Sequence, residues 1–140
     1  MLTNKRTIRV QWGDCDPAGI VFYPRYFEWF DACSILLFEK ATGMTKIRML
    51  EKYGGAGLAL LEARAVFKVA SHYGEDIDIE TEVTEFRRSS FFVKHTVTKG
   101  GAPALEGFET RLWTVRDPAD PTRLKSATMP AEILAGFKGA

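Results

Sequence analysis

A stretch of helical periodicity between Tyr26 and Ala41 constrains the fold of this chain more than any other feature. Large apolar side chains recur there every three or four residues, and most charged side chains lie off the stripe that they form. Pro24 suits the first turn of a helix, and Gly43 suits its C-terminal end. Such a helix is about 27 Å long, and a stripe this broad requires a sheet to cover it. The stripe consists of Tyr26, Phe27, Phe30, Cys33, Ile35, Leu37 and Phe38.

The segments on either side of this helix alternate apolar and polar residues with the period of half-buried β-strands. One such segment precedes the helix and four follow it, and the later four are joined by links short enough to favour antiparallel pairing. We therefore predict an α+β fold, a five-stranded antiparallel sheet wrapped around one long central helix, in a single domain spanning residues 1–140. The expected strands are 7–12, 58–69, 76–86, 90–99 and 105–115, with a loop at 117–122 and short helices at 46–53 and 130–137.

Composition narrows the functional classes. Nineteen basic residues against eighteen acidic ones leave a formal net charge of +1, which argues against nucleic-acid binding dominated by phosphate contacts. No apolar run approaches the roughly 18 residues that a membrane span needs, and the first residues lack the apolar core of a signal peptide, so a cytoplasmic protein is expected. Cys15 and Cys33 are too few for a disulfide framework and have no metal-ligand spacing with His72 and His95, so no metal site is expected.

The strand expected at 58–69 carries apolar residues on both faces, although one face also holds Glu62, Arg64 and Lys68. Its small residues Ala59, Ala63 and Ala65, together with Leu61, are predicted to pack closely against the helix. A single helix cannot cover both faces of a sheet, so we expect a homo-oligomer, most simply a symmetric dimer. The apolar residues of the opposite face are Leu58, Leu60 and Val66.

The segment 13–24 joins the first strand to the long helix and holds the candidate chemistry. Asp16 precedes a proline, which keeps its backbone extended, and the helix that begins near Tyr23 presents unpaired N–H groups that attract a developing oxyanion. A carboxylate that faces such donors across a small gap is an arrangement for acyl transfer. In the structural alternative, Asp14 and Asp16 make Asx-turns or cap a helix, and the residues alone leave both interpretations open.

The run Gly-Asp-Cys-Asp-Pro-Ala-Gly-Ile-Val-Phe-Tyr-Pro-Arg-Tyr at 13–26 resembles the signature of the hot-dog-fold acyl-CoA thioesterases of the 4-hydroxybenzoyl-CoA thioesterase family. The resemblance continues at 27–32 and returns at 85–91. It implies a hot-dog fold, Asp16 as the catalytic carboxylate, and the backbone amide of Tyr23 as the group that polarises the thioester carbonyl. It also implies an enzyme without metal or cofactor, assembled as a homotetramer of dimers with active sites at subunit interfaces.

The function implied by this resemblance is hydrolysis of an aryl-CoA thioester, similar to 4-hydroxybenzoyl-CoA, to the free acid and CoA. Asp16 acts either as a nucleophile, through a mixed anhydride, or as a general base on water, and both routes stay open. Two alternatives remain: a thioesterase for short or medium aliphatic acyl-CoA or acyl-carrier-protein thioesters, and a non-catalytic acyl-CoA-binding module. A dehydratase or hydratase ranks lower, because no histidine lies near the loop or the helix start.

Five further residues are predicted to bind the substrate. Arg87 and Arg88 lie at a bend between two strands, where guanidinium groups suit the phosphates of CoA, although a solvated basic turn is equally compatible. Ser89 follows them where the family pattern has a lysine. Leu58 and Leu60 are predicted to line an acyl pocket, with core or interface packing as the alternative.

Several other reactive residues are assigned structural roles. Asp14 is interpreted as structural, and the aspartates on either side of Cys15 raise the pKa of its thiol and make it a poor nucleophile. His95 shares a strand face with apolar residues and is expected to be packed, whereas His72 is expected in an exposed turn. Asp31 on the helix is a minor catalytic candidate. The three tryptophans, Trp12, Trp29 and Trp113, are expected in the core or at an interface.

Overall fold

The computed structural model describes residues 1–138 and contains the long helix that the periodicity predicted, α1 (Pro24–Thr42). Tyr23 is its N-cap, and Gly43 ends it in the left-handed conformation with φ of 70°. The N–H of Gly43 donates to the carbonyl of Glu39 at 2.9 Å. A side chain is disfavoured at such a positive φ, so glycine stops the helix at this point.

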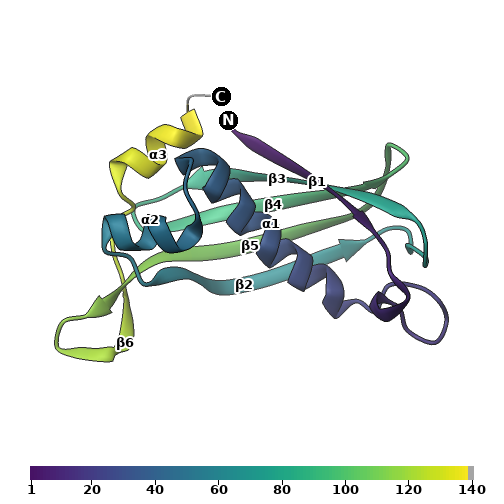
Figure 1. Ribbon diagram of the computed structural model, residues 1–140, viewed down its shortest axis with the longest axis horizontal. Coiled ribbons are helices and arrows are strands. Elements are labelled where there is room, and N and C mark those ends of the chain that lie inside the picture. Colours follow the sequence, from purple (N-terminus) through teal and green to yellow (C-terminus); the bar gives the residue numbers. More distant parts are fainter. Residues whose placement is uncertain (139–140) are drawn as a thin grey trace.

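Five strands form one antiparallel sheet in the order β1-β3-β4-β5-β2, and α1 lies across one face of it (Figure 1). This is the α+β architecture that the alternating segments predicted. The sheet leaves β1 and β2 as its two edge strands, with α1 between them over the centre. The strands are β1 (Thr3–Arg9), β2 (Gly57–Phe67), β3 (Asp76–Phe86), β4 (Ser90–Lys99) and β5 (Ala102–Asp117).

Three short elements complete the fold. The helices α2 (Lys46–Tyr53) and α3 (Ala131–Lys138) lie close to their predicted positions. A 3-10 turn, η1 (Trp12–Asp14), replaces the end of the predicted first strand, so that Trp12 is 65% exposed instead of packed. Among the helices of the described chain, none is long and apolar enough to cross a membrane.

The prediction of five strands missed a sixth, β6 (Asp120–Ser126), which pairs with the end of β5. The turn-forming residues at 117–122 suggested a loop, but only 118–119 form the turn between the two strands, because Asp117 and Asp120 are already paired. The resulting hairpin projects from the end of the sheet that lies beyond α2 (Figure 1).

A β-bulge between Leu60 and Glu62 divides β2 into two halves. The extra residue reverses which face each position occupies. Before the bulge, Leu58 lies opposite Trp113 and is buried, and at the bulge itself Leu61 has no cross-strand partner and is 60% exposed. After the bulge, Ala65 packs against the core as predicted. The prediction that the odd-numbered residues face the helix was therefore wrong for the first half of the strand.

Two apolar clusters fill the space between α1 and the sheet. One surrounds Phe38 and Trp113 near the C-terminal half of α1. The other includes Val10, Val21 and Tyr26, and it anchors both ends of the segment that joins β1 to α1. Full burial of such a side chain stabilises a fold by about 1.5–3 kcal/mol. The ends of the segment are thus fixed in the core while its middle is left at the surface.

Candidate active site

Asp16 lies in the loop between η1 and α1. Two backbone hydrogen bonds close this loop: the N–H of Asp16 donates to the carbonyl of Ile20, and the N–H of Gly19 donates to the carbonyl of Asp16, both at 2.9 Å. Asp16 Oδ1 accepts the N–H of Ala18 at 2.9 Å, which is the Asx-turn of the structural alternative. Within residues 1–138, Asp16 Oδ2 accepts no hydrogen bond. One oxygen therefore holds the turn while the other is available to react.

Asp14 and Cys15 hold the same segment together. Asp14 Oδ2 accepts the N–H of Gln11 at 2.8 Å, and the Asp14 carbonyl accepts the N–H of Phe22 at 2.8 Å. Desolvation, followed by the charges of Asp14 and Asp16, raises the pKa of the Cys15 thiol. A raised pKa leaves little thiolate at neutral pH, so the geometry gives Cys15 no nucleophilic role.

The N–H of Tyr23 is a free donor at the start of α1. The N–H of Arg25 donates to the carbonyl of Phe22 at 2.9 Å, and Pro24 has no N–H. In the described part of the chain, the Tyr23 N–H has no acceptor. Helix N-termini concentrate such unpaired donors and carry partial positive charge. The Tyr23 amide is therefore suited to an anionic oxygen, whereas its ring is 60% exposed.

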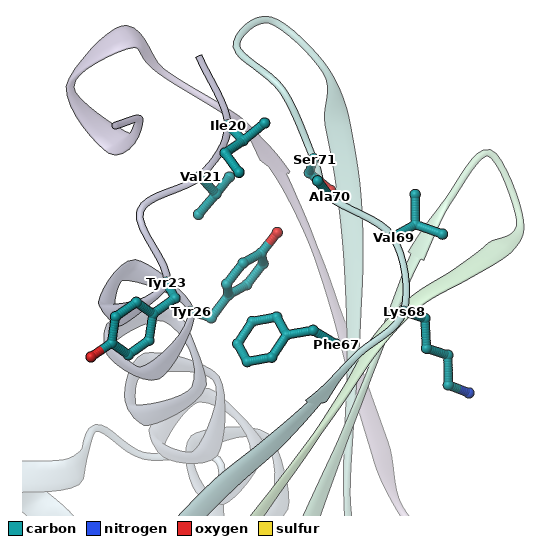
Figure 2. A pocket seen from close by; sticks show the side chains of 9 residues that line it. All are labelled: Ile20, Val21, Tyr23, Tyr26, Phe67, Lys68, Val69, Ala70 and Ser71. Carbon is teal, nitrogen blue, oxygen red and sulfur yellow. The ribbon is translucent and has the colours of Figure 1, made fainter. Parts of the chain in front are cut away.

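A cavity of about 260 Å³ opens beside this helix end (Figure 2). Its wall is formed by the Asp16 loop, by the first turn of α1, and by the end of β2 with the residues that follow it. The rings of Tyr26 and Phe67 meet edge to face inside it, with centroids 5.9 Å apart. An apolar cavity with few polar groups is typical of a small-molecule site. The lining residues are Ile20, Val21, Tyr23, Tyr26, Phe67, Lys68, Val69, Ala70 and Ser71.

One hydroxyl in the cavity wall is buried. Ser71 is 1% exposed, and its Oγ makes no hydrogen bond of ordinary length within residues 1–138. Figure 2 shows the hydroxyl of Tyr26 directed toward Ser71. Burying a hydroxyl unpaired costs about 1–3 kcal/mol. The Tyr26 hydroxyl is the protein group placed to pair with Ser71: burial raises the pKa of Tyr26, and the pairing with Ser71 partly offsets that rise. The two hydroxyls together form a polar spot in the cavity wall.

Asp16 itself is not among the residues that line the cavity. Its backbone is joined to the wall through Ile20, which lines the cavity and accepts the Asp16 N–H. Tyr23 does line the cavity. Within one chain, the carboxylate thus lies at the margin of the cavity and the free amide lies on its wall.

Leu58 and Leu60, predicted to line an acyl pocket, do not reach this cavity. Leu58 is 6% exposed and packs in the core cluster with Trp113, which is the packing alternative. Leu60 lies just before the bulge and is 51% exposed. Both residues lie in the first half of β2, whereas the cavity is at its other end, beside Phe67.

Arg87, Arg88 and Ser89 form the turn between β3 and β4, far from the cavity. The 11 residues of β3, at about 3.3 Å each, separate this turn from the end of the sheet that adjoins the Asp16 loop. Arg87 pairs with Glu85 at 3.4 Å, and Arg88 Nε donates to Thr128 Oγ1 at 3.1 Å. Within a single chain, the predicted phosphate ligands form an exposed basic turn.

Of the residues that line the cavity, only Tyr23 was predicted as a site residue from the sequence. Tyr26 counted only as part of the apolar stripe, Phe67 only as part of the strand expected at 58–69, and Ser71 fell between two expected strands. No local pattern distinguishes these roles, because the cavity arises where the end of β2 passes the start of α1, and that approach depends on the tertiary fold.

A separate group of polar residues is buried under α1. Glu109 accepts hydrogen bonds from Ser34 Oγ at 2.5 Å and from Arg111 Nε at 3.0 Å, and it lies 3.3 Å from His95 Nε2. Burial opposes ionisation of Glu109, but the hydrogen bonds from His95 and Arg111 outweigh it and lower its pKa to about 2. Arg111 also donates to Asp31 at 2.7 Å. His95 is fully buried, as predicted, and the network reaches the surface at Asp31, whose side chain is 58% exposed.

Over residues 1–138, no three or more His, Cys, Asp or Glu side chains are placed to hold a metal ion. The reactive groups at the start of α1 are therefore a carboxylate and a backbone amide beside an apolar cavity. In chemical terms, the pair can direct an oxygen nucleophile at an acyl carbon and stabilise the oxyanion that results.

Comparison with known proteins places this geometry in a family. Residues 10–137 match the family model of the Thioesterase-like superfamily. The 4-hydroxybenzoyl-CoA thioesterase of Pseudomonas sp. (strain CBS-3) is 34% identical over 131 residues, which cover 90% of this chain and 91% of the relative. The solved structure of 4-hydroxybenzoyl CoA thioesterase from Pseudomonas sp. strain CBS-3 matches with a TM-score of 0.86 and 32% identity, over 96% of this chain and 98% of that chain.

A second solved structure is a complex of 4-hydroxybenzoyl CoA with a 4-hydroxybenzoyl CoA thioesterase mutant in which an aspartate is replaced by asparagine. It matches with a TM-score of 0.86 and 31% identity, over 96% of this chain and 98% of that chain. These likenesses confirm the predicted hot-dog fold. With its sequence and fold both matched over nearly their full length, the chain belongs to the thioesterase-like superfamily.

Proposed function

We propose that this protein is an acyl-CoA thioesterase that hydrolyses an aryl-CoA thioester, similar to 4-hydroxybenzoyl-CoA, to the free acid and CoA. One observation carries the proposal: at the start of α1, an Asp16 oxygen and the Tyr23 N–H both lack a protein partner within residues 1–138, beside an apolar cavity. Membership of the thioesterase-like superfamily and 34% identity to a 4-hydroxybenzoyl-CoA thioesterase support thioester hydrolysis.

The chemistry follows from these two groups. The Tyr23 N–H donates to the thioester carbonyl oxygen and stabilises the negative charge that develops there. Asp16 as a nucleophile bonds to the acyl carbon, the carbon–sulfur bond breaks, CoA leaves as a thiolate that takes a proton from solvent, and water hydrolyses the mixed anhydride. Asp16 as a general base instead takes a proton from a water that attacks the same carbon. The relative's substrate complex has an aspartate replaced by its amide, which supports assigning the reaction to an aspartate in this chain as well.

The cavity favours an aromatic acyl group over an aliphatic one. The rings of Tyr26 and Phe67 present flat apolar walls, and the Tyr26 and Ser71 hydroxyls place one polar spot among them. A hydroxylated ring can pair with this polar spot, whereas a plain alkyl chain cannot. Aliphatic acyl-CoA and acyl-carrier-protein thioesters remain the alternative substrates, and both are included in the test below.

Two copies are proposed to pair through β2 into a homo-oligomer. β2 is an edge strand of 11 residues, and Leu61, Val66 and Phe67 on it are 60%, 47% and 52% exposed. A long apolar edge invites pairing with another chain. The opposite edge strand, β1, carries the like charges Lys5 and Arg6, which discourage such pairing, whereas the charges on β2, Glu62 and Arg64, are opposite in sign. Stacking of two such dimers gives the homotetramer that the family resemblance implies.

This pairing gives the distant predicted residues a role across subunits. When one strand pairs with its own copy about a two-fold axis perpendicular to the sheet, the strands run antiparallel, so the start of β2 in one copy lies beside the end of β2 in the other. Leu60 and the turn with Arg87 and Arg88 of a second copy then approach the cavity of the first. We propose that Leu60 contacts the acyl group and that the two arginines contact CoA phosphates in this way, with Ser89 taking the place of a further cation.

The proposed function is tested by a thiol-release assay with benzoyl-, 4-hydroxybenzoyl-, butyryl- and octanoyl-CoA and with octanoyl-acyl carrier protein. We expect the highest kcat/KM for an aryl thioester. Asp16→Asn is expected to lower kcat by about 10² to 10⁴ fold and to keep the fold, because an asparagine carbonyl still accepts the Ala18 N–H. Asp14→Asn is the matched control: it keeps the bond to Gln11 and is expected to stay within a few-fold of wild type.

Two outcomes contradict the proposal. Near-wild-type turnover by Asp16→Asn removes the carboxylate from the mechanism. Tight binding of CoA esters without any thiol release by the wild-type protein favours the non-catalytic acyl-CoA-binding module instead.

A further inference from the structure

We propose that Glu75 is a positioning residue for the thioesterase reaction, because its carboxylate, together with Lys99, fixes the turn at 70–75 on which the Asp16 loop is built. This inference rests on the proposed function, and it concerns residues outside the loop, the helix start and the cavity wall. Glu75 does not line the cavity. Its effect on the reaction is therefore transmitted through the turn.

The turn first holds the start of the loop. The N–H of Val10 donates to the carbonyl of Glu75, and the N–H of Gly74 donates back to the carbonyl of Val10, both at 2.9 Å. Val10 is the last residue before the loop and is fully buried. The point at which the chain leaves β1 toward Asp16 is thus bound to the turn by a reciprocal pair of hydrogen bonds.

The turn also holds the end of the loop. The N–H of Tyr73 donates to the carbonyl of Gly19 at 3.1 Å, and the N–H of Val21 donates to the carbonyl of Ser71 at 2.9 Å. Four backbone hydrogen bonds therefore connect the turn to both sides of Asp16. The Trp12 and Tyr73 rings add an edge contact, with centroids 5.5 Å apart. The turn acts as the template that determines where the Asp16 loop lies.

The shape of the turn depends on the Glu75 carboxylate. Oε1 accepts the N–H of His72 at 2.6 Å and lies 2.9 Å from His72 Nδ1. Oε2 lies 3.2 Å from Lys99 Nζ, which also donates to the carbonyl of Ala70 at 2.7 Å. Lys99 is the last residue of β4, so this clasp ties the turn to the sheet. Burial opposes the charge of Glu75, but its hydrogen bonds with His72 and Lys99 lower its pKa.

Small displacements of a catalytic group are costly. A shift of about 1 Å in a reacting group can cost up to 10² fold in rate. Without the Glu75 carboxylate, the N–H of His72 and the ammonium of Lys99 lose their shared partner, and the turn gains freedom to move with the loop that it supports. The turn also supplies Ala70 and Ser71 to the cavity wall, but the rings of Tyr26 and Phe67 are held by other contacts. We therefore expect a larger loss in kcat than in substrate binding.

The test is a double-mutant cycle of Glu75→Ala and Lys99→Met in the full chain, measured with the best aryl thioester. We expect each single variant to lower kcat about tenfold, with KM changing less than threefold. The double variant is expected to have a kcat no lower than that of the less active single variant. Asp76→Ala is the matched control: Asp76 is the next residue, and its carboxylate pairs with Arg9 on β1, not with the turn. It is expected to stay within twofold of wild type. Glu75→Gln keeps an acceptor for the His72 N–H and is expected to recover part of kcat.

Hydrogen–deuterium exchange tests whether Glu75 holds the Asp16 loop in place, independently of any measurement of enzymatic activity. We expect faster amide exchange over residues 10–22 in Glu75→Ala than in Asp76→Ala, whether or not a substrate has been found. If the wild-type chain hydrolyses no thioester, the proposed function fails while this result still supports the clasp. If Glu75→Ala fails to fold, Glu75→Gln supplies the same comparison. Wild-type kcat and wild-type exchange in a folded Glu75 variant overturn the inference.

Discussion

The ring of Phe30 lies against the backbone of Gly107, so closely that a Cβ built on Gly107 would be 2.4 Å from Phe30 Cε2. Phe30 also stacks on His95, with ring centroids 4.5 Å apart and planes 7° apart. Gly107 and His95 are cross-strand neighbours on β5 and β4. The missing side chain at Gly107 therefore sets the closest approach of α1 to the sheet, in the half of the helix that begins at the active site.

Gly107→Ala is expected to push Phe30 away from the sheet. Overpacking of this kind costs about 1–3 kcal/mol, and urea denaturation measures it as a lower free energy of unfolding. Gly57→Ala is the control, because the atom nearest to its added Cβ is 3.9 Å away. Equal stability of the two variants would show that the contact with Phe30 relaxes without cost.

Ser71→Ala is expected to change the choice of substrate more than the rate. The variant removes the Ser71 hydroxyl from the cavity and leaves its apolar walls in place. A hydrogen bond worth about 0.5–1.5 kcal/mol corresponds to a loss of roughly 2- to 12-fold in kcat/KM for 4-hydroxybenzoyl-CoA relative to benzoyl-CoA. An unchanged ratio means that the ring hydroxyl does not meet Ser71.

Acid is expected to destabilise the fold through Glu109. Its pKa is lowered from 4.5 to about 2 in the folded chain, so folding favours the ionised carboxylate. Its contribution is complete above pH 4.5 and is lost as the pH falls toward about 2, which removes on the order of 3 kcal/mol from the free energy of unfolding.

Urea denaturation between about pH 7 and pH 3 measures this slope. Glu109→Gln should flatten it, and it should also lower the free energy of unfolding near neutral pH, because Arg111 loses its buried carboxylate partner and keeps only the half-exposed one, Asp31. Glu80→Gln, on the exposed face of β3, serves as the control. If the free energy of unfolding of Glu109→Gln still falls with pH as steeply as in the wild type, other carboxylates cause the acid sensitivity.

Charge on the β2 edge is expected to disrupt the proposed dimer. Leu61 lies near the middle of β2, so Leu61→Lys places like charges close together when the strand pairs with its own copy. We expect sedimentation to show a dissociation constant raised tenfold or more, with activity falling in proportion to the loss of dimer. Leu124→Lys on β6, which is similarly exposed, should leave the dimer intact. Dissociation by both variants would argue against β2 as the specific contact.

Local patterns predicted the parts of the fold that depend on local physics. The helix of Pro24–Thr42 and its stop at Gly43 follow from spacing and backbone freedom within one segment. The bulge at Leu61 did not, because a bulge is defined by the partner strand, which the alternation of one strand does not contain. β6 was missed because the turn residues at 118–119 resemble a longer loop until Asp120 pairs with Asp117.

The residues of the candidate site also differ in whether the sequence alone could identify them. Asp16 and Tyr23 could be identified from one continuous run of residues. Ser71 could not, since nothing in its neighbourhood predicts that the turn after β2 would pass beside the start of α1. Likewise, the sequence placed Arg87 and Arg88 at a bend but could not specify which end of the sheet the bend occupies, and the structure puts it at the end remote from Asp16.

The bulge in β2 adds one extra residue, Leu61, to the strand. The positions that face the core are therefore even-numbered before Leu61 and odd-numbered after it. Deleting this one residue would leave a regular ladder, in which Leu58 and Ala65 keep their partners Trp113 and Gly107 and stay on the same face of the strand. An alignment that places the gap elsewhere in the strand would therefore assign every residue between the gap and Leu61 to the wrong face. Homologues that lack the bulge should present different side chains on this edge strand to a neighbouring subunit, even where the sequences on either side are similar.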